Sequence, residues 1–180
     1  YDLIGIDLMA DVVKSLVNIL PTNDAFHRYS APIDFMTNMV ANGQTGNKNN
    51  KGFYRDDGEE RQVISLINGD YVPYERLRVP LLEETEQEGI STLLNDNGPF
   101  GLYAWRVLSE TLCYAASLVP EVTEDLTQID DAMKLGYNWV KGPFELLDEI
   151  GVGYFIDRLQ KDGREMPSFI TKGLKSGFYI

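Results

Sequence analysis

Apolar residues recur every three or four positions along most of the chain, which is the spacing that places them on one face of an α-helix. Near the N-terminus such a stripe consists of Met9, Val12, Val13, Leu16 and Leu20. Asp7 precedes the stripe as a candidate N-cap, and Pro21 ends it. Residues 1–5 are typical of the end of an earlier helix, with Gly5 just beyond its last turn. A further helix is predicted over residues 30–43, with Ser30 as its N-cap.

The second half of the chain is more regularly helical. From Gly101 the pattern predicts a long helix whose inner face consists of Trp105, Leu108, Leu112, Ala115 and Val119. Further helices are predicted over residues 123–136, 143–151 and 154–163, the second of which opens at Pro143. A last short helix leads into Gly177-Phe178-Tyr179 near the C-terminus.

One segment between the two halves has the character of β-structure. Residues 62–74 contain two β-prone runs around Asn68-Gly69, the pair that best tolerates the positive φ angles of a type I′ hairpin turn. An isolated hairpin is only marginally stable, so this one must pack against helices or a neighbouring segment. Residues 78–98 are acidic and weakly helical, and they indicate a connector. The predicted fold class is all-α, a helical bundle with one β-hairpin.

Two stretches of the chain repeat one another in the same order. At a constant separation, Asp2, Ile4, Gly5 and Asp11 match Asp148, Ile150, Gly151 and Asp157. Gly-Phe-Tyr at 52–54 then matches Gly-Phe-Tyr at 177–179, which indicates an internal duplication with shorter loops in the second copy. The predicted organisation is the remainder of a first helical repeat over residues 1–60, the hairpin and acidic connector over 61–98, and a complete second repeat over 99–180.

The charge balance is strongly acidic, with 28 Asp and Glu against 16 Lys and Arg and a formal net charge of −12. No basic stripe is present to neutralise phosphates, so nucleic acid is excluded as a partner. The sequence contains no uninterrupted apolar window of about 18 residues, so no membrane span is predicted. The single cysteine, Cys113, excludes an intramolecular disulfide and indicates a cytoplasmic protein, and its apolar helical surroundings favour a buried, inert thiol.

Several residue types that serve catalysis elsewhere stand here in settings that favour structural roles. His27, the only histidine, lies in a predicted loop and is interpreted as a surface or cap residue. The acidic run at 83–88 is typical of a solvated helix face, because no spaced set of ligands accompanies it. The loop at 43–52 lacks the Gly-Lys-Ser/Thr of a phosphate-binding loop and favours a structural turn.

Two pairs of acidic residues also need an interpretation. Asp130-Asp131 and Asp148-Glu149 stand near predicted helix termini, where carboxylates commonly cap the helix or interact with its dipole. This structural interpretation is preferred to a paired-acid catalytic site. The prediction for catalytic, cofactor-binding and metal-binding residues in this chain is therefore none.

Residues 129–152, with the sequence IDDAMKLGYNWVKGPFELLDEIGV, resemble the C-terminal helical domain of 3-hydroxyacyl-CoA dehydrogenases. The shared pattern consists of Asp130 or Asp131, Ala132, Met133, Gly136, the run Gly-Pro-Phe-Glu-Leu at 142–146, Asp148 and Gly151. Lys-Gly-Phe-Tyr at 51–54 resembles the close of the family's first helical repeat. Residues 66–74 and 101–122 resemble the larger bacterial fatty-acid β-oxidation proteins, which carry two such repeats, so the resemblance covers nearly the whole chain.

The resemblance implies an all-helical domain that packs beside a dinucleotide-binding domain, which this chain lacks. It also implies that the domain helps to form the acyl-CoA cleft and the subunit interface. The family's catalytic His and Glu lie in that other domain, and NAD is the cofactor of the parent enzyme, so this fragment is expected to bind no cofactor. In the family, the first repeat carries an Asn near the active site. Trp105 stands at the equivalent position of the second repeat, so no catalytic role is expected for Trp105.

The function implied is that of a C-terminal, non-catalytic portion of an NAD-dependent 3-hydroxyacyl-CoA dehydrogenase of fatty-acid β-oxidation, inactive by itself. The apolar opening of the chain indicates a fragment whose first repeat lacks its opening helices, so it is expected to expose apolar surface and to form a homo-oligomer. Two alternatives stay open: the helical domain of another dehydrogenase, and a free-standing helical interaction module. The upstream sequence distinguishes the first, and a natural start near Tyr1 would favour the second.

Overall fold

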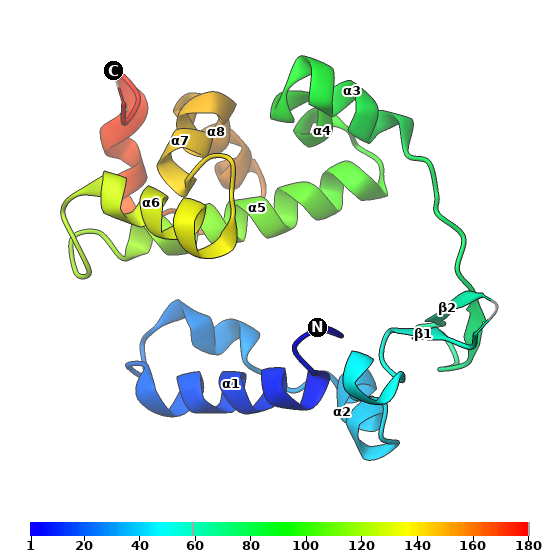
Figure 1. Ribbon diagram of the computed structural model, residues 1–180. Helices are drawn as coiled ribbons and strands as arrows, with labels where there is room; N and C mark the ends of the chain where they lie inside the picture. Colours follow the sequence, from blue (N-terminus) through cyan, green and yellow to red (C-terminus); the bar gives the residue numbers. More distant parts are fainter. Residues whose placement is uncertain (59, 180) are drawn as a thin grey trace. The chain divides into compact units, whose positions relative to one another are not determined.

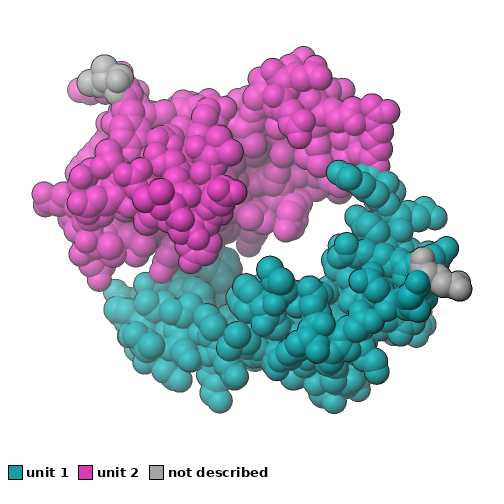
Figure 2. Space-filling view, viewed as in Figure 1, with its two compact units in different colours: residues 1–77 teal, residues 78–180 magenta. Residues whose placement is uncertain are grey.

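The computed structural model describes residues 1–58 and 60–179. The chain divides into two compact units, unit 1 (Tyr1–Leu77) and unit 2 (Arg78–Ile180), which have different colours in Figure 2. This division places the acidic segment at 78–98 in unit 2, together with the second predicted repeat. The three-part division predicted from the sequence concerns repeats and stays a prediction.

The helices of unit 1 are α1 (Ile6–Ile19), α2 (Asp34–Ala41) and the short 3-10 helices η1 (Ala25–Tyr29) and η2 (Asn47–Asn49) (Figure 1). The prediction that Asp7 caps α1 is wrong. Gly5 is the N-cap residue, and Asp7 lies in the first turn, where its carboxylate forms an ion pair with Lys48. The start of α2 was also predicted too early, because Ile33 is still extended, with φ −93° and ψ 113°.

Unit 1 also contains a three-stranded antiparallel sheet in the order β1-β2-β3, with β1 at Tyr54–Asp56, β2 at Arg61–Ile64 and β3 at Tyr71–Pro73. The predicted hairpin corresponds to β2 and β3, in which Val63 pairs with Val72. The sequence did not predict β1, whose three residues are too few to show an alternating pattern. It pairs with β2 in antiparallel register, with Tyr54 opposite Val63.

The predicted type I′ turn at Asn68-Gly69 is wrong. The loop between β2 and β3 spans six residues, 65–70, and of the predicted pair only Gly69 adopts a positive φ, of 80°. The loop is closed by Ser65 N, which donates to Asp70 O at 2.8 Å, and by Gly69 N, which donates to Ser65 O at 2.8 Å. Asn68 uses its side chain instead, and accepts from Asp70 N at 3.2 Å. Local side-chain bonds of this kind compete with a tight two-residue turn.

Unit 2 is helical throughout its described elements. These are α3 (Pro80–Glu88), α4 (Ile90–Asn95), α5 (Pro99–Ser117), α6 (Leu126–Tyr137), α7 (Pro143–Ile150), α8 (Val152–Lys161) and η3 (Ser168–Leu174) (Figure 1). Three of them begin with Pro at the first turn, where the missing N–H has no helical partner to lose. The weakly helical segment at 78–98 therefore folds as two helices, and Leu94 of α4 is fully buried.

The core of unit 2 lies between α5, α7 and α8. Trp105 and Leu112 of α5, Phe144 of α7, and Phe155 and Leu159 of α8 belong to one buried cluster. The inner face predicted for α5 is thus confirmed. Unit 1 has a much smaller buried cluster, which consists of Ile6, Met39 and Ile64.

The chain is mostly helical, as predicted, but its β-structure is a small three-stranded sheet and not a single hairpin. Within the described residues, no helix is long and apolar enough to cross a membrane.

Candidate functional site

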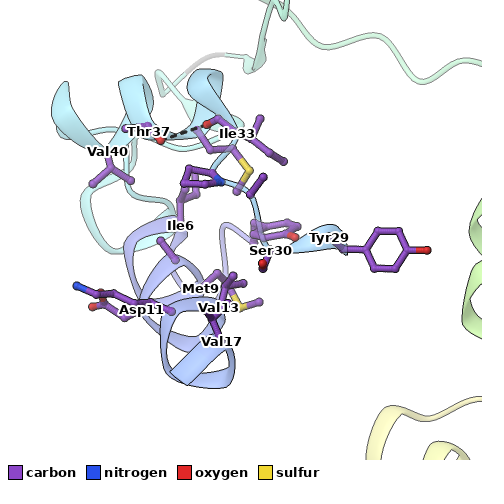
Figure 3. Close-up of a pocket in the computed structure, with 16 residues that line it drawn as sticks. Ile6, Met9, Asp11, Val13, Val17, Tyr29, Ser30, Ile33, Thr37 and Val40 are labelled. Atoms are coloured by element: carbon purple, nitrogen blue, oxygen red, sulfur yellow. Dashed lines mark hydrogen bonds between the residues drawn. The ribbon is translucent and has the colours of Figure 1, made fainter. Parts of the chain in front are cut away.

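Unit 1 carries an apolar groove between α1 and the segment that runs from Tyr29 into α2 (Figure 3). Its volume is about 550 Å³. The α1 side is formed mainly by Ile6, Met9, Ala10, Val13 and Val17. The opposite side is formed mainly by Ala31, Pro32, Ile33, Met36 and Val40, and Tyr1 also lines the groove.

The α1 helix is amphipathic, with Asp7, Asp11, Ser15 and Asn18 along one side and apolar residues along the rest of its surface. Met9, Val13 and Val17 line the groove, while a second apolar row is exposed elsewhere on the helix, with Leu8 50% and Ile19 77% accessible. The apolar surface of α1 is wider than the part that the groove uses. In unit 1 as it stands, too little of the chain packs against α1 to cover it.

The polar side chains of the groove are few and lie among apolar ones. Thr37 Oγ1 donates to Ile33 O at 3.3 Å, so this hydroxyl is already engaged (Figure 3). Asp11 and Lys14 are the charged lining residues, and none of the described lining residues is a histidine or a cysteine. Such a surface can bind another apolar surface, and it lacks a pair of groups arranged for acid–base catalysis.

A second feature, found once in each unit, is a carboxylate that holds the backbone of a Gly-Phe-Tyr segment. In unit 1 Asp2 accepts hydrogen bonds from Phe53 N at 2.9 Å and Tyr54 N at 2.7 Å. In unit 2 Asp148 accepts hydrogen bonds from the next Phe-Tyr pair, from Phe178 N and Tyr179 N, both at 2.8 Å. We call these two arrangements the carboxylate clamps.

The glycine of each clamp is required by close approach. A Cβ atom on Gly52 would lie 2.5 Å from the Asp2 carboxylate, and one on Gly177 would lie 2.9 Å from Asp148 Oδ1. Gly177 also has a φ of +78°, which side chains resist. The sequence showed both Asp and both Gly-Phe-Tyr segments, but not that they touch, because the Asp and the Phe are 51 residues apart in the first copy and 30 in the second.

Each clamp holds a phenylalanine in an aromatic trio. In unit 1 Phe53 stacks on Phe35 with centroids 6.5 Å apart and meets Tyr1 edge-on at 6.3 Å. In unit 2 the corresponding trio is Phe178, stacked on Phe169 at 5.9 Å and edge-on to Phe144 at 5.1 Å. The two units therefore share the carboxylate clamp and a stacked phenylalanine pair, while the third ring differs, because the register places Tyr1 on Leu147 and not on Phe144.

Asp130 is the most deeply buried carboxylate of the described residues, with 1% of its surface accessible. It accepts hydrogen bonds from Phe144 N at 2.8 Å and Glu145 N at 3.1 Å at the N-terminus of α7, and from the Tyr179 hydroxyl at 2.8 Å. Burial raises the pKa of Asp130, which these hydrogen bonds oppose. Burial and the neighbouring Asp130 also raise the pKa of the Tyr179 hydroxyl.

The structural interpretation of the acidic pairs is therefore confirmed for Asp130, although it caps α7 and not its own helix. Asp131 pairs with Lys134 at 3.1 Å. The expectation that Asp148 caps a helix or meets its dipole is wrong, because this residue in the last turn of α7 binds the C-terminal segment. Glu149 pairs with Lys141 at 3.1 Å.

Trp105 is committed to packing and hydrogen bonding. Its indole N–H donates to Asp162 Oδ2 at 2.6 Å, and the guanidinium of Arg158 lies 4.3 Å from its ring centroid. Only 5% of its surface is accessible. The position is thus an anchor that ties α5 to α8, with no group free for chemistry.

The remaining candidates also have structural partners. His27 lies in η1, with Nε2 2.9 Å from Pro21 O. Burial raises the pKa of the Cys113 thiol to about 11, so the thiol is protonated near neutral pH. In the acidic run, Glu83 pairs with Arg78 at 2.7 Å, and no group of three or more His, Cys, Asp or Glu within the described residues is placed to hold a metal ion. The prediction that the chain has no catalytic residue stays a prediction.

Residues 101–169, from the start of α5 to the start of η3, match the family described as 3-hydroxyacyl-CoA dehydrogenase, C-terminal domain. A probable 3-hydroxyacyl-CoA dehydrogenase of Bacillus subtilis is 30% identical over 99% of this chain and 23% of its own length. A putative fatty acid oxidation complex trifunctional enzyme of Rickettsia prowazekii is 34% identical over 82% of this chain and 20% of its own length.

The chain therefore spans less than a quarter of the length of these relatives. Among solved structures, a 3-hydroxybutyryl-CoA dehydrogenase of Escherichia coli superposes with a TM-score of 0.58 and 18% identity, over 96% of this chain and 49% of that one. At this identity the likeness concerns the fold alone. The match of residues 101–169 to the family, together with the two sequence relatives, shows that this chain contains a 3-hydroxyacyl-CoA dehydrogenase C-terminal domain and is homologous to bacterial fatty-acid oxidation enzymes.

Proposed function

We propose that the chain is a C-terminal, non-catalytic portion of a cytoplasmic, NAD-dependent 3-hydroxyacyl-CoA dehydrogenase of fatty-acid β-oxidation. In the parent enzyme it walls the acyl-CoA cleft and forms part of the interface with the dinucleotide-binding domain or with a second subunit. The observation that carries this proposal is the match of residues 101–169 to the family's C-terminal domain, since these residues supply most of the buried core of unit 2.

The duplicated organisation is part of the same proposal. Unit 1 supplies the end of a first helical repeat, and unit 2 contains a second. The two carboxylate clamps support this, because Asp2 and Asp148 hold matching Phe-Tyr segments at matching distances. The stacked phenylalanine pair beside each clamp, Phe35 with Phe53 and Phe169 with Phe178, supports it further.

The proposal that this chain is non-catalytic is supported by the kind of sheet it contains. A dinucleotide is bound at the carboxyl ends of parallel strands, where a helix N-terminus meets the pyrophosphate. The sheet of unit 1 is antiparallel and consists of three short strands. The hydride transfer of the parent therefore takes place in the neighbouring dinucleotide-binding domain, and this chain contributes shape.

The test is an assay of the purified 180-residue chain with NADH and acetoacetyl-CoA, followed at 340 nm. We expect no NADH consumption above background, because neither the cofactor nor the acid–base pair has a site in this chain. A full-length 3-hydroxyacyl-CoA dehydrogenase serves as the positive control, and circular dichroism verifies that the chain is helical. NADH consumption above background by the chain itself would contradict the proposal.

A second candidate function is that of a free-standing helical interaction module. The observation that favours it is the open apolar groove of unit 1, which can receive a helix or another apolar surface. The two candidate functions predict different coding sequences upstream of Tyr1. A gene that begins near Tyr1 supports the module, and a coding sequence that continues upstream into a dinucleotide-binding domain supports the dehydrogenase.

A further inference from the structure

We propose that a pocket in unit 1, between α2 and the loop that joins β2 to β3, binds the main chain of an extended peptide segment of a partner protein. The pocket has a volume of about 430 Å³ and shares no lining residue with the apolar groove. Its walls are α2 with the residues that follow it, the end of β2, and the loop after β2. The site is independent of the dehydrogenase assignment, so either can fail without the other.

The floor of the pocket is apolar and belongs to the core of unit 1. Met39 and Ile64 have only 2% and 4% of their surfaces accessible. Phe35 packs against the same buried cluster and stacks on Phe53, with ring centroids 6.5 Å apart. Because the core holds these side chains in place, the floor exists before a ligand arrives, and it can bury one apolar side chain of that ligand.

The rim of the pocket is polar but uncharged. Its polar side chains are the amides of Asn38, Asn42, Gln44 and Asn68, and none of the described lining residues is charged. The chain as a whole has a net charge of −12, yet this pocket offers a charged ligand no counter-ion. A side-chain amide has N–H donors and a carbonyl acceptor, which are the groups that a peptide unit also presents. The rim therefore matches an uncharged ligand made of amides.

Two of the four amides already have partners in the protein. Asn68 is committed to its own loop, because its Nδ2 donates to Asp70 Oδ2 at 2.6 Å and its Oδ1 accepts from Asp70 N at 3.2 Å. Gln44 Nε2 donates to the Tyr71 hydroxyl at 3.4 Å, which leaves Gln44 Oε1 as an acceptor for a ligand. The other two amides supply most of the recognition.

Asn38 and Asn42 have both groups of their side-chain amides open. Within the described part of the chain, no hydrogen bond occupies either amide. The two residues are four positions apart, on α2 and at its C-cap, so they lie on one face and about 6 Å apart along the helix axis. In an extended peptide, alternate residues direct their N–H and C=O groups to the same side at intervals of about 6.6 Å. Two such residues can pair with the two asparagines, whereas a helical ligand has already paired its own backbone groups.

Unit 1 contains the expected contact in another place. Asn50 Oδ1 accepts from Asp56 N at 3.0 Å, and Asn50 Nδ2 donates to Asp56 O at 2.5 Å. Asp56 is the last residue of β1, so one side-chain amide holds both backbone groups of an extended residue. A peptide in the pocket would form the same pair of hydrogen bonds with Asn38 and again with Asn42.

The test is a titration of the isotope-labelled 180-residue chain with the blocked peptide acetyl-Thr-Leu-Thr-N-methylamide. Binding is followed by the side-chain amide signals of Asn38 and Asn42 in nitrogen-15 NMR spectra. This probe is uncharged, favours an extended backbone, and carries one apolar side chain between two residues that can face the asparagines. N-acetylglucosamine is the comparison probe, because it is uncharged and forms hydrogen bonds but has no extended peptide backbone.

The Asn38→Ala variant removes one of the two open amides, and Asn18→Ala is the matched control. Both asparagines are exposed on helices of unit 1, and Asn18 lines neither the pocket nor the apolar groove. Alanine favours helix at both positions, so both variants should keep their fold, which circular dichroism verifies.

We expect saturable shifts of both amide signals with the peptide, and a dissociation constant in the millimolar range or tighter. Binding to Asn38→Ala should be weaker by roughly fivefold or more, because two hydrogen bonds are lost, while binding to Asn18→Ala should be unchanged. The absence of saturable shifts would overturn the proposal, as would equal affinities for the unmodified chain and Asn38→Ala. N-acetylglucosamine that binds the pocket as tightly as the peptide would also overturn it, since the site would then recognise hydroxyl groups.

Discussion

At the scale of single residues, some glycines stand where the backbone closely approaches a carboxylate. Gly177 is such a position, because it combines a φ of +78° with a Cβ site 2.9 Å from Asp148 Oδ1. Gly153 of α8 offers a contrast, since it has a helical conformation and nothing within 4 Å of its Cβ site. The sequence marks both as glycine but does not distinguish their roles.

We predict opposite effects for alanine at these two glycines. Gly177→Ala should lower the free energy of unfolding by roughly 1–3 kcal/mol, because the methyl group strains the backbone and displaces the Asp148 carboxylate. Gly153→Ala should raise it by about 0.5 kcal/mol, because alanine restricts the unfolded chain and favours helix. Urea denaturation followed by circular dichroism measures both, and a neutral Gly177→Ala variant would contradict the close approach.

At the scale of elements, unit 2 is held together by carboxylates that bridge elements far apart in the sequence. Asp130 at α6 caps α7, and Asp148 at the end of α7 holds the C-terminal Phe-Tyr. Tyr179 then closes a circuit by donating its hydroxyl to Asp130. Each carboxylate satisfies backbone N–H groups that would otherwise be left without partners, which is costly in a protein interior.

The clamp of unit 2 joins α7 to the C-terminal segment through two backbone hydrogen bonds. Asp148→Ala should lower the free energy of unfolding by about 1–3 kcal/mol, because Phe178 N and Tyr179 N lose their acceptor. Asp157→Ala on the exposed side of α8 is the matched control and should change it by less than about 0.5 kcal/mol. Chemical denaturation of the two variants in parallel measures the difference, and equal stabilities would show that the clamp contributes nothing.

At the scale of the whole molecule, the two units differ in completeness. Unit 2 has a continuous core of aromatic and aliphatic side chains, whereas the buried cluster of unit 1 is limited to Ile6, Met39 and Ile64. Unit 1 also exposes apolar side chains on both flanks of α1. Contiguous exposed apolar surface promotes association.

The 180-residue chain is therefore predicted to self-associate. Sedimentation velocity over a range of concentrations should show a sedimentation coefficient that rises with concentration, and Val13→Asp should reduce the effect because it places a charge in the groove. Ser15→Asp, outside the groove, should leave it unchanged. A chain that sediments as a monomer at every concentration would count against the prediction.

The sequence predicted the periodic elements well and the non-local ones poorly. The inner face of α5 was visible because Trp105, Leu112 and Ala115 follow helical spacing within a single segment. The strand β1 and the six-residue loop before β3 were not, because they depend on pairing across the sheet and on the side chain of Asn68. Asp7 was misassigned because aspartate is favoured both at the N-cap and in the first turn of a helix.

By itself, the sequence determined that this chain is mostly helical, that Asp and Gly-Phe-Tyr recur in one order, and that it resembles a dehydrogenase C-terminal domain. Local periodicity and short motifs carry that information. Only the tertiary structure decided that each Asp binds its own Phe-Tyr segment, and that α1 is open where α8 is covered. Those facts depend on contacts between segments that are far apart in the sequence. The spacing of such residues along the chain does not show which of them meet.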